Sequence, residues 1–232
     1  MSTDRLLESF FKIIGNSEDY FISGSLSFLP LLNNYRKPGL DIDISIKKSI
    51  FYQRQEEILK EGSLKVLRLS EVAVAKTSNI VKWISPKTDF IHLETADGLL
   101  DFALYTEKEN SIDFKLGFGI VMSIPKYVLD KINILEWNNI SYRAAPPELM
   151  FLTKSVEFIQ CSSKGDLSYK KSKHFEDIQR MAKIIDWDFL EKVRNEMKIM
   201  WFVFPGKLNR KLNPFPKIVQ SIDIEHLKSE FL

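Results

Sequence analysis

In the first part of the chain, some segments have apolar residues at helical spacing and others have them at strand spacing. Leu6, Leu7 and Phe10 recur at the spacing of one helix face. Ile42 and Ile44 instead alternate with polar residues, which is typical of a strand. The elements predicted up to residue 60 are a helix over 3–14, a strand over 19–23, a helix over 25–33, a strand over 40–46 and a helix over 50–60.

The middle of the chain has the pattern of a series of short strands. Asp97-Gly98 is a turn sequence of the kind that joins two antiparallel strands. The segment over 71–77 is ambiguous in its pattern. The predicted strands cover 64–69, 79–84, 90–94, 99–105 and 112–118.

The pattern changes to helical spacing after Pro146. Pro147 and Glu148 are typical of the first turn of a helix. Further helices are expected around 175–185, over 189–204 and over 222–232. We therefore predict two domains, an α/β domain over residues 1–145 and a helical domain over residues 146–232.

Composition narrows the class of protein without naming a function. The chain has 232 residues, 44% hydrophobic and 28% charged, with a formal net charge of +2. This charge gives no general signature of polyanion binding. Cys161 is the single cysteine and has no internal disulfide partner, which suits a reducing cytoplasm. The apolar run over 199–204 is too short to cross a bilayer, so we expect a cytoplasmic protein without a membrane partner.

Two aspartates stand two residues apart inside an apolar strand pattern. Alternation in a strand over 40–46 would place Asp41 and Asp43 on one face and the isoleucines on the other. Two like charges side by side are costly unless a cation lies between them, and carboxylate oxygens suit Mg²⁺. Upstream, Gly24 allows a phosphate to approach the backbone, and Ser25 adds a hydroxyl and an amide at a predicted helix start. This combination predicts a site for a nucleoside triphosphate.

A two-metal site needs a third carboxylate close by. Asp101 lies in an apolar strand pattern and is the first candidate. Asp113 has the same local pattern and is the rival. The alternative for Asp101 is an edge-strand aspartate that faces water.

These residues, in this order, resemble the nucleotidyltransferase superfamily of polymerase-beta type. Its pattern is Gly-Ser, a short helix, Asp-x-Asp in a strand and a later apolar-Asp-apolar strand. The run Ala145-Pro146-Pro147-Glu148-Leu149, then Lys154, then Lys173-His174-Phe175-Glu176-Asp177-Ile178, is similar to the AbiEii-like toxin branch. His174 stands where that branch usually has an aspartate, and Ser23-Gly24-Ser25-Leu26 differs from its common double-glycine form.

The resemblance implies an α+β fold, namely a nucleotidyltransferase fold with a mixed β-sheet flanked by helices, followed by a C-terminal helical bundle domain. It implies transfer of a nucleotidyl group from a nucleoside triphosphate, with two Mg²⁺ ions. Asp41 and Asp43 would bind metal, and Asp101 would help to bind metal or to activate the acceptor hydroxyl.

The resemblance also assigns the remaining site residues. Gly24 and Ser25 would contact the triphosphate, Lys154 would neutralise its charge, and Asp177 would orient Lys154 or the acceptor. For Lys154 and for a Lys173–Asp177 pair, the alternative is a solvated helix surface. The implied role is an RNA-modifying toxin, with a tRNA end as acceptor and an antitoxin protein as partner. Two alternatives stay open: a small-molecule acceptor, and a non-catalytic nucleotide- or RNA-binding module.

Overall fold

We describe the protein from a computed structural model. The structure describes residues 3–14, 17–39, 41–54, 57, 65–69, 90–94, 97–117, 120–163, 172–201, 219 and 221–232. The predicted strand over 79–84 and the ambiguous segment over 71–77 lie outside these residues. The strands are β1 (Tyr20–Ile22), β2 (Asp41–Lys47), β3 (Lys65–Leu69), β4 (Phe90–Glu94), β5 (Leu99–Glu107), β6 (Ser111–Gly117), β7 (Ile120–Pro125), β8 (Asn133–Trp137), β9 (Ile140–Ala144) and β10 (Lys198–Trp201).

Helices flank this set of strands. The α-helices are α1 (Thr3–Ile14), α2 (Lys48–Gln53), α4 (Pro147–Ser163), α5 (Lys173–Met181), α6 (Trp187–Glu196) and α9 (Ile224–Phe231). The 3₁₀ helices are η1 (Gly24–Ser27), η2 (Pro30–Leu32) and η4 (Lys126–Lys131). No helix in the described ranges combines the length and the apolar character needed to cross a membrane.

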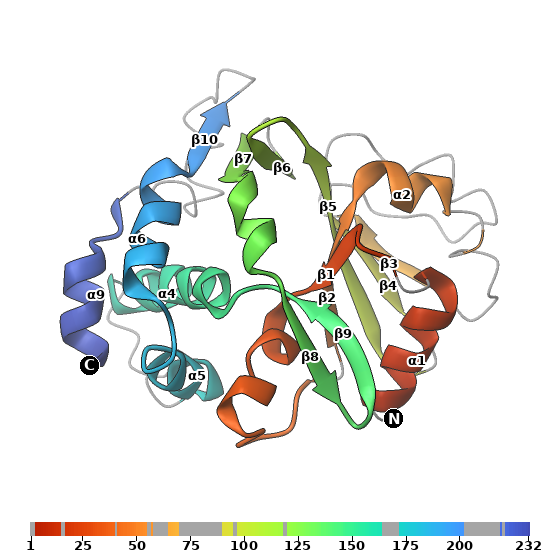
Figure 1. Cartoon of the computed structure of the whole chain (residues 1–232), viewed down its shortest axis with the longest axis horizontal. Helices are drawn as coiled ribbons and strands as arrows, with labels where there is room; N and C mark the ends of the chain where they lie inside the picture. The colour runs from red at the N-terminus through yellow and green to blue at the C-terminus, as the bar shows by residue number, and fades with distance from the viewer. Residues whose placement is uncertain are drawn as a thin grey trace.

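The strands form one mixed sheet in the order β10-β7-β6-β5-β2-β1-β9-β8, and β4 pairs with both β3 and β5 (Figure 1). Strands β2 and β5 run parallel, as do β1 and β9, and the other pairs are antiparallel. The expected hairpin pairing of β4 with β5 is confirmed. This order places β2 and β5 near the middle of the sheet. Each of them has a hydrogen-bonded strand on both sides.

The two faces of the sheet carry different cores. On one face, α1 and α2 pack on the sheet, and a cluster that includes Phe10, Phe51 and Phe102 is buried between them. On the other face, Phe21, Phe114, Leu149 and Val193 belong to a second cluster that joins the sheet to α4 and α6. A third cluster fills the space among α4, α5, α6 and α9 and includes Phe28 of the segment after η1. Helices α4, α5, α6 and α9 gather on one side of the sheet in Figure 1.

Two helix predictions are wrong. Residues 25–33 form η1 and η2 rather than one α-helix, because Pro30 has no N–H for an α-helical hydrogen bond and Asn33 ends η2 in the left-handed region. The helix predicted over 189–204 ends at Glu196, and β10 pairs with β7 instead. Its backbone turns extended at Met197, so apolar residues at helical spacing enter the sheet.

Most of the other predicted elements are present in the described residues. The helix over 3–14 and the strands over 64–69, 90–94, 99–105 and 112–118 are confirmed within a few residues, whereas α2 begins at Lys48, before the predicted start. Strands β7, β8 and β9 were not predicted. Because β10 joins the sheet, residues after 146 contribute to both the helical cluster and the sheet, and the division into domains 1–145 and 146–232 stays a prediction.

Candidate nucleotide and metal site

Alternation along β2 separates its carboxylates from its isoleucines. Ile42 and Ile44 are buried in the core beneath α1 and α2. Asp43 and Ser45 point to the opposite face and line a cavity there. The expected separation of acidic and apolar side chains on this strand is therefore present. The cost of holding carboxylates on a central strand is reduced because this face opens into a cavity rather than into packed core.

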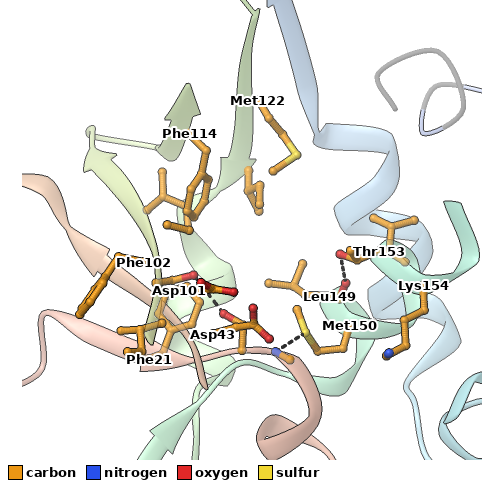
Figure 2. Close-up of a pocket in the computed structure, with 18 of the residues that line it drawn as sticks. Phe21, Asp43, Asp101, Phe102, Phe114, Met122, Leu149, Met150, Thr153 and Lys154 are labelled. Atoms are coloured by element: carbon orange, nitrogen blue, oxygen red, sulfur yellow. Dashed lines mark hydrogen bonds between the residues drawn. The ribbon is translucent and has the colours of Figure 1, made fainter. Parts of the chain in front are cut away.

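Asp43 and Asp101 are direct neighbours across the parallel β2–β5 ladder. Both side chains line the same cavity, and Figure 2 shows them side by side. Asp41 lies one strand repeat earlier, is exposed, and is not among the described residues that line the cavity. Its carboxylate bends back towards Gly39, since a Cβ on Gly39 would lie 2.0 Å from Oδ1 of Asp41.

The rival Asp113 lies on the other face of the sheet. Asp101 and Tyr105 share one face of β5, and Thr106 is on the other face. Asp113 pairs with Thr106 across β5 and β6, so its side chain points away from the face of Asp101. Its carboxylate accepts hydrogen bonds from Ser111 and Ser123 and forms an ion pair with Lys108. Burial would raise the pKa of Asp113, but these hydrogen bonds and the lysine hold the pKa below its usual value. The carboxylate of Asp113 is thus bound to Ser111, Ser123 and Lys108 on the face opposite the cavity.

Gly24 forms a tight turn directly against Asp43. Its φ is +61°, in the left-handed region, and a Cβ there would lie 1.9 Å from Oδ2 of Asp43. The Gly24 amide N–H donates to the thioether sulfur of Met150 on α4, at 3.0 Å (Figure 2). Ser25 is not among the described residues that line the cavity, and η1 has only four residues, so the helix dipole expected at Ser25 is weak.

Lys154 and Asp177 are brought together by α4 and α5. Lys154 Nζ lies 3.2 Å from Oδ2 of Asp177 and 3.0 Å from Nδ1 of His174. Because a protonated lysine has only donors, Nδ1 of His174 accepts this hydrogen bond. Lys154 and His174 line the cavity, whereas Asp177 is fully buried behind them.

Asp177 is held by two residues that the sequence pattern did not indicate. Arg36 donates two hydrogen bonds to its two carboxylate oxygens, at 2.8 and 2.7 Å, and Tyr35 donates to Oδ1. Burial alone would raise the pKa of Asp177, but the hydrogen bonds from Arg36 and Tyr35 and the charge of Lys154 hold the pKa below its usual value. Asp177 therefore stays an anion that fixes Lys154 in place.

The cavity has a volume of about 600 Å³ and lies between the sheet and α4. The carboxylates of Asp43 and Asp101 and the side chains of Lys154 and His174 supply its charged and titratable groups. The rest of its lining is mostly apolar, from β6, β7, α4 and the residue after α6. A volume of this size is typical of sites for small molecules.

The donor set of this cavity fits Mg²⁺ when a phosphate is also bound. In the parts of the chain that the structure describes, no three His, Cys, Asp or Glu side chains form a ready-made metal cage. Mg²⁺ is usually held by one or two carboxylates together with waters and substrate phosphates, and the adjacent Asp43 and Asp101 supply two carboxylates. The turn at Gly24 leaves the space beside Asp43 open, since a side chain there would fill it.

Comparison with solved structures identifies the fold. The solution structure of the antibiotic-resistance factor ANT(2'')-Ia is similar with a TM-score of 0.53 and 14% identity, covering 84% of this chain and 91% of that chain. The crystal structure of the lincosamide antibiotic adenylyltransferase LnuA, lincomycin-bound, gives a TM-score of 0.51 and 14% identity, covering 80% of this chain and 99% of that one. The crystal structure of ANT(2'')-Ia in complex with adenylyl-2''-tobramycin gives 0.52 and 14%, covering 82% and 95%. No protein-family model and no curated protein sequence matches the chain. The chain therefore has the nucleotidyltransferase fold, as the sequence predicted.

Proposed function

We propose that this protein is a metal-dependent nucleotidyltransferase that moves a nucleoside monophosphate group from a nucleoside triphosphate to an acceptor hydroxyl. The observation that carries this proposal is the register of Asp43 with Asp101 beside the Gly24 turn. That arrangement puts two hard oxygen donors next to a backbone amide that faces a cavity. The fold, shared with adenylyltransferases of known structure, supports the same reaction class.

Asp41, Asp43 and Asp101 would hold Mg²⁺. The family resemblance implies two Mg²⁺ ions. Bound Mg²⁺ would offset the charge that develops on the attacking and leaving oxygens. Asp43 and Asp101 already lie in the cavity. Asp41 would join them by a rotation of its exposed side chain away from Gly39.

The protein's own groups would position the reactants. The Gly24 amide would donate to a phosphate oxygen in place of Met150, and Lys154 would neutralise the departing pyrophosphate. Asp101 would accept the proton of the acceptor hydroxyl. A bond then forms between that oxygen and the α-phosphorus, and the bond from the α-phosphorus to the pyrophosphate oxygen breaks. Catalysis of this kind comes mainly from positioning and charge neutralisation.

Asp177 would act as a positioning residue in this scheme. It is fully buried, so it contacts Lys154 and not the reactants. Its two hydrogen bonds from Arg36 fix the carboxylate that in turn fixes Lys154. This supports the first of its two expected roles, the orientation of Lys154.

The acceptor separates two versions of the proposal. The AbiEii-like motifs support an RNA-modifying toxin, with a tRNA end as acceptor and an antitoxin protein as partner. The cavity favours the alternative, a small-molecule acceptor, because it is bounded and mostly apolar. A non-catalytic nucleotide- or RNA-binding module would keep the fold and bind a ligand without turnover.

Incubation with each α-³²P-labelled nucleoside triphosphate, Mg²⁺ and total RNA tests the proposal, with pyrophosphate release measured in parallel. Asp43→Asn should abolish release. Asp113→Asn is the matched control, because this aspartate lies on the opposite face of the sheet. Triphosphate binding without pyrophosphate release, for any nucleotide and with both RNA and small hydroxylated acceptors, would favour the binding module instead.

A further inference from the structure

One part of the cavity is apolar throughout and lies beyond the carboxylates. We name it the apolar wall, and it consists of Ile112 and Phe114 of β6, Met122 and Ile124 of β7, Leu149 of α4 and Met197. The strand order is β7-β6-β5-β2-β1, so Asp101 and Asp43 lie between the β6 and β7 residues of the wall and the Gly24 turn. In Figure 2, Phe114 and Met122 lie on one side of the aspartates, and Met150 and Lys154 lie on another.

We infer that the apolar wall is the acceptor subsite, and that its substrate is an uncharged, hydroxyl-bearing small molecule with an apolar body. This inference rests on the proposed function. In-line transfer requires the attacking hydroxyl to approach the α-phosphorus from the side opposite the departing pyrophosphate. If pyrophosphate leaves toward Gly24 and Lys154, the opposite side is the side of Asp101 and β6.

The charges around the cavity argue against a polycationic acceptor. Asp43 and Asp101 are its lining carboxylates among the described residues, and both belong to the reaction centre in this proposal. The six residues of the wall carry no charge. The ammonium groups of a polyamine-like acceptor would lose their hydration at this wall without gaining carboxylate partners there, which is unfavourable.

The same wall argues against a nucleic-acid acceptor. Phosphate backbones are bound by lysine and arginine side chains that replace counterions. Lys154, the lining lysine of the described cavity, lies on the triphosphate side and forms an ion pair with Asp177. An apolar body instead gains by leaving water for Phe114, Met122 and their neighbours. The cavity volume of about 600 Å³ suits such a molecule.

Methionine methyl groups provide a direct readout of binding to the wall. The chain has six methionines, and Met122, Met150 and Met197 line the cavity, whereas Met181 is buried in the helical cluster. In protein labelled with [methyl-¹³C]methionine, we would titrate 4-nitrophenyl β-D-glucopyranoside, tobramycin and a short single-stranded RNA. Each titration would be repeated with Mg²⁺ and a non-hydrolysable triphosphate analogue at saturation.

The inference predicts that the aryl glucoside shifts the Met122 and Met197 methyl resonances saturably, with and without the analogue, and leaves Met181 unchanged. Tobramycin and RNA should not shift Met122 or Met197. Met122→Glu should raise the Kd of the glucoside at least tenfold, while the isosteric Met122→Leu should keep it within threefold. Met122 lines the cavity and is only partly buried, so both substitutions should leave the protein folded.

Three results would overturn the inference: shifts of Met122 and Met197 by tobramycin or RNA, no shift by any probe, or displacement of the glucoside by the triphosphate analogue. The last result would make the wall a nucleoside subsite. Failure of the proposed function looks different, because the glucoside would still bind the wall while pyrophosphate release stayed absent with every triphosphate.

Discussion

The Cα of Gly24 and the carboxylate of Asp43 are so close that a methyl group on Gly24 would lie 1.9 Å from Oδ2 of Asp43. Gly24→Ala must therefore displace the aspartate and also hold alanine at a φ of +61°, which costs about 1 kcal/mol. We expect kcat/KM for pyrophosphate release to fall about 100-fold or more, since a displacement of about 1 Å at a reacting centre has this effect. Thermal unfolding should show a lowering of only a few degrees.

Gly39→Ala is the matched comparison for that variant. A Cβ on Gly39 would lie 2.0 Å from Oδ1 of Asp41, but Asp41 is exposed and can rotate away. We expect less than about a tenfold loss of activity, because no buried group must move. Equal losses in the two variants would contradict a special role for the Gly24–Asp43 contact.

Substitution of Asp101 should affect mainly activity, whereas substitution of Asp113 should affect mainly stability. Asp101→Asn removes a carboxylate that lines the cavity, so pyrophosphate release should fall about 100-fold or more with little change in unfolding free energy. Asp113→Asn leaves the cavity intact but weakens the hydrogen bonds from two serines and the ion pair with Lys108. It should cost about 1–3 kcal/mol in urea unfolding and leave kcat near that of the wild type. The opposite assignment of effects would restore Asp113 as the third carboxylate.

The strand face of Asp43 could be predicted because a strand has a period of two residues, and the isoleucines that alternate with its polar residues fix which face is buried. The pairing of Asp43 with Asp101 could not, because it depends on the parallel register of β2 and β5 across more than fifty residues of chain. Asp101 and Asp113 have the same kind of local sequence pattern, and Asp101 was only the first of two candidates. The sheet places them on opposite faces.

The contacts around Asp177 and the strand β10 could not be predicted from the local sequence pattern. Arg36 lies in a turn-rich segment without periodicity, and its partner is 141 residues away. Residues 189–204 have apolar residues at helical spacing, yet the edge of β7 offers β10 main-chain partners that a helix would not use. In both cases a tertiary contact decides the outcome, so no window of sequence contains the signal.

In the proposed reaction, Met150 would compete with the triphosphate for the Gly24 amide. Its sulfur accepts the Gly24 N–H at 3.0 Å, so a phosphate oxygen must displace it. Met150→Leu keeps the volume but removes the acceptor, and the weak hydrogen bond lost is worth about 1 kcal/mol or less. We expect KM for the triphosphate to fall about two- to fivefold, with kcat nearly unchanged, in steady-state pyrophosphate release. A higher KM would mean that the sulfur assists binding rather than competes.

Glu107 links three elements by ion pairs and should make stability depend on pH. Its carboxylate pairs with Lys126 at 2.5 Å and Lys47 at 2.7 Å, and the hydrogen bonds from Lys126 and then Lys47 lower the pKa of Glu107 to about 2. A lowered folded-state pKa stabilises the fold above the unfolded pKa of about 4.5, and this stabilisation is lost as pH falls towards 2. Glu107→Gln should therefore cost about 1 kcal/mol at pH 7, after allowance for solvent screening, and almost nothing at pH 2.

Urea unfolding of the wild type and Glu107→Gln at several pH values between 2 and 7 measures this difference. Glu176→Gln is the control, because its pair with Arg180 is exposed on α5 and should change the unfolding free energy at pH 7 by about 0.5 kcal/mol or less. A constant difference between wild type and Glu107→Gln from pH 7 to 2 would contradict the role of the Glu107 charge.

Arg36 should prove to be coupled to Asp177 in both stability and substrate binding. Arg36→Ala removes the two guanidinium hydrogen bonds to a fully buried carboxylate and leaves it with Tyr35, Lys154 and the more distant His174, which should cost about 3 kcal/mol in urea unfolding. Lys154 is then drawn more strongly to Asp177, so KM for the triphosphate should rise about five- to tenfold, while kcat changes less. Arg36→Lys should recover only part of either loss, because lysine cannot form the two parallel hydrogen bonds.

Adding Asp177→Asn to Arg36→Ala removes the unpaired charge and makes the coupling measurable. The double variant should be more stable than Arg36→Ala alone, with an interaction energy of about 2 kcal/mol in a double-mutant cycle. Its KM for the triphosphate should stay raised, because Lys154 has lost the carboxylate that orients it. Additive stability changes would show that Arg36 and Asp177 act independently, and a wild-type KM in the double variant would remove Asp177 from the positioning of Lys154.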